Sequence, residues 1–213
     1  MDTVRTKIII AITGAVLLLF VCGHLLGNLL IYFGAEALNT YAKGLHAMPF
    51  VLFPVRVVLG ICLVVHLYLT WRLYRRNRKA RGSAYHYNQY REASISSRHM
   101  IFTGVVLLFF IAYHLAHLTL KVTDARFAQF ESYDVYSMLV LSFSDVGVAG
   151  FYMLAMVFLG LHLQHGISSL FQTLGISNKP NLRKILIGGS VLAWLIALGN
   201  LSIPLAIFVG IIG

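Results

Sequence analysis

The sequence contains little charge, and most of what it has is of one sign. Only 11% of the 213 residues are Asp, Glu, Lys or Arg, seven of them acidic, whereas 59% of the residues are apolar. A soluble domain of this length needs more polar surface than this chain has. The composition therefore indicates an integral membrane protein.

The excess of basic over acidic residues gives a formal net charge of +10, which by itself suggests a nucleic-acid partner. Eight of the 17 Lys and Arg residues, however, lie in one hydrophilic segment, from Arg72 to Arg98. A basic segment beside membrane spans is a topology signal, and no soluble domain is left to carry a nucleic-acid site. We therefore expect membrane lipid, and no nucleic acid, among the partners.

Cysteine is almost absent as well. Cys22 and Cys62 each lie within an apolar run, where packing in lipid accounts for them. The sequence has no C-x-x-C-H motif, which excludes a haem attached covalently in the usual way.

Long apolar segments fill most of the chain, at about residues 8–33, 50–74, 100–121, 146–172 and 185–209. The 26 residues from Ile8 to Phe33 contain no charged side chain and would form a helix about 39 Å long, enough to cross a bilayer. Lipid offers the backbone no hydrogen-bond partner, so spans of this length are helical. The sequence predicts an all-α fold in which residues 1–213 form one membrane domain of five transmembrane helices. Residues 35–48 are predicted to add a short interfacial helix that Pro49 closes.

The basic residues are divided unequally between the two sides of such a bundle. One side receives the N-terminal residues, the 72–98 segment and the residues before the fifth span: Arg5, Lys7, Arg72, Arg75, Arg76, Arg78, Lys79, Arg81, Arg91, Arg98, Lys179, Arg183 and Lys184. The other side receives only Lys43, Lys121 and Arg126. The positive-inside rule then predicts that the N-terminus lies inside and the C-terminus outside.

Histidines occur inside four of the five predicted spans, where an ionisable side chain is a functional hypothesis by default. They are His24, His66, His114 with His117, and His162 with His165. We measure the depth of each histidine from the inner end of its span, at about 1.5 Å per residue. His24 and His114 lie about 24 and 21 Å from that end, and His66 and His162 lie about 12 and 15 Å from it. The four histidines therefore form an outer and an inner level, about 10 Å apart.

Two histidines at one level on two helices suit the axial positions of a b-type haem, because trans ligands approach a flat macrocycle from opposite faces. Two histidines three apart on one helix share a face and cannot do so. Bis-histidine ligation leaves no open coordination position, which suits electron transfer. His117 and His165 would then contact haem propionates or border a quinone pocket. Further candidates for contacts with haem propionates or a quinone are Asn28, Arg56, Arg98, Lys121 and Gln164. Candidates for proton handling on the outer side are Glu36, Asn39, His46 and Asp134.

The His114/His117 and His162/His165 pairs leave a second interpretation open, since histidines on one helix face also suit zinc or copper. A single four-histidine site would need both pairs at one depth, but the predicted topology puts His117 about 15 Å above His165. A histidine-based metal transporter remains the alternative of another class.

Two glycines flank the first of these histidines in the stretch CGHLLGNLL. Gly23 and Gly27 have the spacing of a G-x-x-x-G helix-packing face. Small residues beside an axial ligand would also let a macrocycle approach the helix, and we expect this second role for them.

The chain resembles the di-haem cytochrome b membrane anchor of succinate dehydrogenase and fumarate reductase. The resemblance is carried by TGAVLLLFVCGHLLGNLLIYFG in the first span, VVHLYLTWRLYRR in the second, YHLAHLT in the third and FYMLAMVFLGLHLQHGISSLFQTLG in the fourth. It implies the ligand set that depth suggests, with His24 and His114 on an outer haem and His66 and His162 on an inner one.

The resemblance also implies partners and a location. A flavoprotein subunit would react with succinate or fumarate, an iron–sulfur subunit would pass electrons to the inner haem, and a membrane quinone, menaquinone by expectation, would exchange them with the outer one. The chain itself has no flavin or iron–sulfur motif and no catalytic residue of its own for succinate. The implied location of the protein is a bacterial or archaeal-type cytoplasmic membrane. Two other kinds of membrane anchor remain as alternatives: a cytochrome b anchor for a hydrogenase or formate dehydrogenase, and a structural anchor without haem.

Overall fold

The computed structural model describes residues 3–80, 99–176 and 179–213, and within these ranges the chain is helical and contains no strand. Helices long and apolar enough to cross a membrane run over Thr3–Phe33, Pro49–Lys79, Met100–Thr119, Val146–Thr173 and Asn181–Phe208. The predicted all-α bundle of five membrane helices is confirmed.

The long elements are α1 (Thr3–Asn28) with the 3₁₀ segment η1 (Leu29–Phe33), α3 (Pro49–Ala80), α5 (Met100–His114) with the π-helical segment η2 (Leu115–Thr119), α7 (Val146–Thr173) and α8 (Lys179–Phe208). The short elements are α2 (Ala35–His46), η3 (Ala125–Gln129) and α6 (Val135–Phe143). The short helix predicted within residues 35–48 is thus present as α2.

The second long helix extends past the apolar run that predicts it. The apolar pattern ends near residue 74, but α3 continues through Arg75–Lys79 to Ala80. Arg, Lys and Ala are good helix formers, so the helix does not stop where its side chains become polar. Of the basic segment, Arg81, Arg91 and Arg98 lie outside the described residues.

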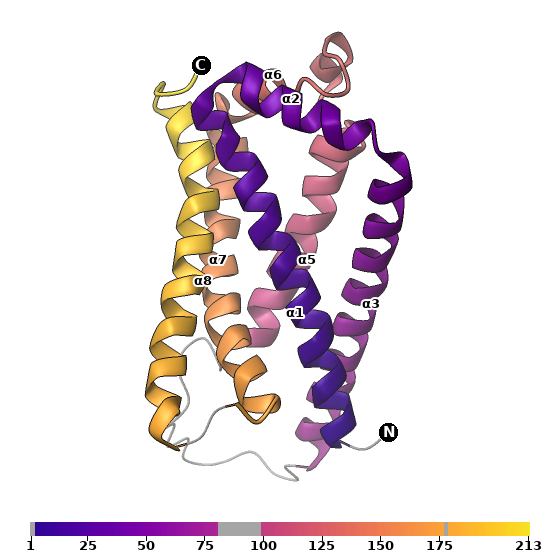
Figure 1. The fold of residues 1–213 in the computed structure, drawn as a ribbon, viewed down its shortest axis with the longest axis vertical. Coiled ribbons are helices and arrows are strands. Elements are labelled where there is room, and N and C mark those ends of the chain that lie inside the picture. Colours follow the sequence, from indigo (N-terminus) through magenta and orange to yellow (C-terminus); the bar gives the residue numbers. More distant parts are fainter. Residues whose placement is uncertain (1–2, 81–98, 177–178) are drawn as a thin grey trace.

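The four histidine-bearing helices are arranged as two neighbouring pairs. Helix α1 packs against α3, α5 packs against α7, and α8 covers α7. Figure 1 shows α3 and α8 at opposite sides of the bundle, with α2 and α6 across the end where the C-terminus lies. The N-terminus lies at the other end, together with the last turns of α3 and the first turns of α8. All described basic segments of the predicted inner side therefore share one end.

Packing is uneven across the bundle. Small residues let α7 and α8 approach closely: a Cβ on Gly160 would lie 2.9 Å from the Trp194 ring, and Ala193 is completely buried. In contrast, the most apolar stretch of α3 contains no buried residue. One part of α3 is thus left for lipid and another for the cavity described below.

Aspartates begin the helical segments at the C-terminal end of the bundle. Asp124, Asp134 and Asp145 each accept backbone N–H groups at the starts of η3, α6 and α7. The Arg126 guanidinium donates to Asp124 at 2.7 Å and holds the pKa of that carboxyl at about 2. These three aspartates therefore act as helix caps.

Candidate functional site

A cavity of about 1760 Å³ is lined by residues of both helix pairs. Ordinary small-molecule pockets have volumes of about 300–1,000 Å³, so this cavity has room for more than one large ligand. Its lining on α1 runs from Val4 to Asn28, which is about 36 Å of helix and therefore the depth of a bilayer. The lining includes the predicted axial ligands His24, His66, His114 and His162.

The two histidines of the predicted outer level lie together. The ring centroids of His24 and His114 are 5.8 Å apart, and the ring planes are nearly perpendicular at 85°. Metal–imidazole bonds are about 2 Å long, which puts two rings on opposite sides of one metal about 6 Å apart between centres. Each ring also stacks on the phenylalanine four residues before it, Phe20 at 5.5 Å and Phe110 at 5.7 Å. The separation fits two axial ligands of one haem.

The two histidines of the predicted inner level are each held by a threonine on the other helix of their pair. His66 Nδ1 lies 3.3 Å from Thr13 Oγ1, and His162 Nδ1 lies 3.2 Å from Thr103 Oγ1. Each threonine already donates its own proton to a backbone carbonyl of its helix, at 2.8 Å for Thr13 and 2.9 Å for Thr103. The threonine oxygen is therefore the acceptor and the ring Nδ1–H the donor. This assigns the lone pair, and hence metal-binding capacity, to Nε2 of both rings.

A longer hydrogen-bond chain fixes His114. Ser142 donates to the Met138 carbonyl at 2.6 Å, so its oxygen accepts from His117 Nε2–H at 3.2 Å. His117 Nδ1 then accepts from the Tyr152 hydroxyl at 2.9 Å. The Tyr152 oxygen, 3.4 Å from His114 Nδ1, is left to accept from it, so Nε2 of His114 also keeps its lone pair.

His117 and His165 are not among the described residues that line the cavity. His117 is only 2% exposed, and both of its ring nitrogens are hydrogen-bonded. It lies in the π-helical segment η2, which begins directly after His114, and its ring contacts Tyr152 of α7, as the His114 ring does. His165 is half-buried on α7. A propionate or quinone contact at His117 would have to break one of its two hydrogen bonds.

Small residues shape the cavity where the rings lie. A Cβ on Gly14 would be 3.3 Å from the His66 ring, and one on Gly104 would be 3.4 Å from the His162 ring. Gly23 lines the cavity with nothing within 4 Å of its added Cβ, in line with the expected room for a macrocycle. Gly27 does not follow that expectation, because its Cβ would lie 2.6 Å from the Tyr41 ring. Gly27 thus makes room for Tyr41.

Other polar candidates are divided between the cavity and packing contacts. Asn28, Arg56 and Lys121 line the cavity, whereas Gln164 donates to Ser190 on α8 at 3.2 Å. Arg98 lies outside the described residues. Sequence reasoning missed Thr70, which lines the cavity one turn from His66 and whose buried hydroxyl has no hydrogen-bond partner within the described part of the chain. An orphaned hydroxyl on the cavity wall fits a bound polar group such as a carboxylate.

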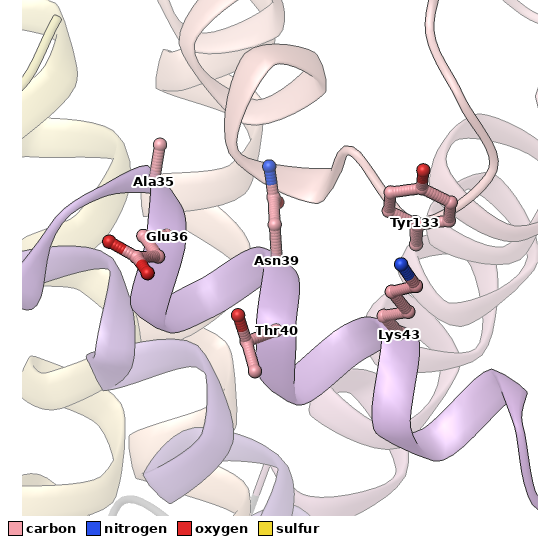
Figure 2. A pocket seen from close by; sticks show the side chains of 6 residues that line it. All are labelled: Ala35, Glu36, Asn39, Thr40, Lys43 and Tyr133. Atoms are coloured by element: carbon pink, nitrogen blue, oxygen red, sulfur yellow. The ribbon is translucent and has the colours of Figure 1, made fainter.

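The candidates for proton handling lie on or near α2. His46 donates to the Ala42 carbonyl at 2.9 Å and lines the outer part of the cavity. Glu36 and Asn39 line a separate surface hollow of about 400 Å³ between α2 and Tyr133. Figure 2 shows Lys43 reaching toward Tyr133, and its Nζ is 5.2 Å from the centre of that ring.

The described residues give no support to a one-ion metal site. Among residues 3–80, 99–176 and 179–213, no three or more His, Cys, Asp or Glu side chains are grouped closely enough to hold an ion. The histidines that line the cavity suit a haem better, since each haem needs only two protein ligands.

Five apolar helices around one histidine-lined cavity of membrane depth define a multi-pass membrane protein with an internal ligand site. Residues 72–198, more than half of the chain, match the family described as succinate dehydrogenase/fumarate reductase transmembrane subunit, and the chain belongs to that family. It is thus a membrane subunit of an oxidoreductase complex. Searches among curated proteins and among solved structures find no match. The matched segment contains His114 and His162 but begins after His24 and His66.

Proposed function

We propose that the chain is the di-haem cytochrome b anchor of a succinate:quinone oxidoreductase. His24 and His114 would hold the outer haem, and His66 and His162 the inner one. One observation carries the proposal: histidines from four different membrane-spanning helices line a single cavity of about 1760 Å³. Membership of the succinate dehydrogenase/fumarate reductase family favours this donor complex over a hydrogenase or a formate dehydrogenase.

The residues around the cavity have three tasks in this proposal. Hydrogen bonds from Nδ1 of His66, His114 and His162 orient the rings and keep Nε2 available for iron. The apolar walls exclude water, which lowers the local dielectric and tunes the reduction potential. Each haem, once bound, supplies one-electron transfer. Thr70 is a candidate partner for an inner-haem propionate.

The partners follow from the same proposal. A flavoprotein subunit and an iron–sulfur subunit would dock at the inner end, where the N-terminus and the described basic segments lie, and electrons would enter at the inner haem (Figure 1). A membrane quinone, menaquinone by expectation, would react near the outer haem. The bundle would sit in a bacterial or archaeal-type cytoplasmic membrane with its N-terminus inside.

The test is to purify the complex with this chain, quantify haem by pyridine haemochrome and identify the co-purifying subunits. We expect two b haems per chain. His66→Ala and His162→Ala should each remove the same one of the two spectral components, and His24→Ala and His114→Ala should each remove the other. His99→Gln, at an exposed histidine just before α5, serves as the control and should keep both haems.

Two results would contradict the proposal. Membranes rich in the protein but without haem would leave only a structural anchor or a metal transporter, which metal analysis would distinguish. Loss of a haem in His117→Ala with both haems kept in His114→Ala would overturn the assigned ligands.

A further inference from the structure

The two inner histidines are supported in the same way from opposite sides of the cavity. Thr13 on α1 accepts from His66 on α3, and Thr103 on α5 accepts from His162 on α7. The two Oγ1–Nδ1 distances, 3.3 and 3.2 Å, differ by only 0.1 Å. Each contact stays within one helix pair, so each pair orients one of the two inner ligands.

The supporting threonines belong to an internal repeat that links the first and third spans. The stretches TGAVLLLFVCGHL from Thr13 and TGVVLLFFIAYHL from Thr103 are offset by 90 residues and agree at eight of thirteen positions. In both stretches a glycine directly follows the threonine, and a histidine lies eleven residues after the threonine.

The repeated positions make repeated contacts. The glycine after each threonine faces the inner histidine ring, with added-Cβ distances of 3.3 Å for Gly14 and 3.4 Å for Gly104. The phenylalanine seven residues after each threonine stacks on the outer histidine of its own helix, at 5.5 Å for Phe20 and 5.7 Å for Phe110. Helices α1 and α5 therefore each carry one complete set of supports, a threonine and glycine for the inner level and a phenylalanine for the outer level. Only the second copy, in α5, lies within the segment that matches the family. The repeat indicates that α1, outside that segment, supports the histidines in the same way as α5.

We propose that Thr13 and Thr103 are a matched pair of positioning residues that orient the two ligands of the inner haem and lower its reduction potential. The inference rests on the proposed function, because it needs the inner haem to be present. An acceptor on Nδ1–H makes an imidazole more basic toward its metal. A more basic ligand stabilises the ferric over the ferrous state, and two such acceptors act on the same iron.

The experiment uses the assembled complex, with each threonine replaced by valine, which has the same shape without the hydroxyl, and by serine, which keeps the hydroxyl. Optical redox titration reports the midpoint potential of each haem, and pyridine haemochrome reports haem content. Thr40→Val, the same chemical change at an exposed position on α2, is the matched control. His66→Ala in parallel identifies the spectral component that belongs to the inner haem.

We expect Thr13→Val and Thr103→Val each to raise the midpoint potential of the inner haem alone, by similar amounts, and the double variant to raise it further. The serine variants and Thr40→Val should keep the wild-type potential. Loss of the inner haem in the valine variants, with retention in the serine variants, would also support a positioning role of the hydroxyl.

Unchanged potentials and haem content in both valine variants would overturn the inference, as would a shift confined to the outer haem. Equal haem loss in valine and serine variants would overturn it too, because the hydroxyl would then not be the feature that matters. A wild-type complex with two bis-histidine haems would leave the proposed function intact in each of these cases, so the two failures are distinguishable.

Discussion

At the scale of single residues, the support of His114 differs from that of the inner ligands. Its Nδ1 meets the Tyr152 hydroxyl, that hydroxyl donates to the buried His117, and His117 donates in turn to Ser142. All protons in this chain of hydrogen bonds point one way, from His114 toward the Met138 carbonyl. His117 therefore acts on the outer level through Tyr152.

Replacing Tyr152 by Phe tests this chain. The change removes the acceptor of His114 Nδ1–H and the donor to His117 Nδ1, and a buried group left without its partner costs about 1–3 kcal/mol. We expect a raised midpoint potential of the outer haem, an unchanged inner haem and a lower denaturation temperature in detergent. Tyr113→Phe, at the residue directly before His114 on α5, removes a hydroxyl that takes part in none of these four hydrogen bonds; it is the control and should leave both potentials in place. A shift of the inner haem with none of the outer would contradict the assignment.

Which of these residues the sequence reveals depends on how unusual they are in their surroundings. A histidine in an apolar span is conspicuous, so all four predicted haem ligands are identifiable from the sequence. Tyr152 and Thr13 are ordinary residues in such a span, and only the fold puts their oxygens beside a ring nitrogen. The repeat around Thr13 and Thr103 is a signal in the sequence that points to the two threonines, and it does not reach Tyr152.

At the scale of elements, Asp134 and Asn39 join the two short helices that cross the outer end. Asn39 Nδ2 donates to Asp134 at 2.8 Å, and the Tyr136 N–H donates to Asn39 Oδ1 at 3.0 Å. Asp134 also accepts from the Ser137 N–H at 3.2 Å and so caps α6. Burial alone would raise the pKa of Asp134, but the hydrogen bonds from Ser137 and Asn39 outweigh it and hold that pKa below its ordinary value. Asn39 and Asp134, two of the four predicted proton-handling candidates, thus have a structural role.

Replacing Asp134 by Ala should destabilise this end by about 0.5–2 kcal/mol, the usual effect of a lost N-cap. Because the folded-state pKa is lowered, the contribution is complete above the ordinary carboxyl pKa of about 4 and disappears as the pH falls through the lowered value. The gap in denaturation temperature between wild type and Asp134→Ala should therefore close on acidification. Asp134→Asn, which can still cap α6, is the control. A gap that stays constant from neutral to strongly acidic pH would contradict this account.

Element types are more predictable than element ends in this chain. Long apolar runs identify the five spans, because lipid leaves the backbone only helical solutions. The continuation of α3 to Ala80 and the π-helical segment after His114 are not visible in hydropathy. The π-helical segment matters most, because it begins directly after His114 and carries His117.

At the scale of the whole molecule, the predicted haem ligands of both helix pairs line one large cavity. Each level takes one histidine from each pair: His24 from α1 with His114 from α5, and His66 from α3 with His162 from α7. Two bis-histidine haems would therefore cross-link the pairs twice, at two depths. Helix α3 depends most on this link, because the most apolar part of its surface contains no buried residue and its main neighbour is α1.

In the proposed di-haem anchor, haem should accordingly be a structural element of the bundle as well as a redox cofactor. A ligand at 100 times its Kd adds about 2.7 kcal/mol of stability per site, which corresponds to a shift of at least about 5 °C in a chain of this size. We expect protein from haem-limited cells to denature at a correspondingly lower temperature in detergent, and added haemin to restore the higher value. His66→Ala, with one haem removed, should fall between these two states, and His99→Gln should match the wild type. Equal denaturation temperatures with and without haem would mean that the two helix pairs hold together through protein contacts and lipid alone.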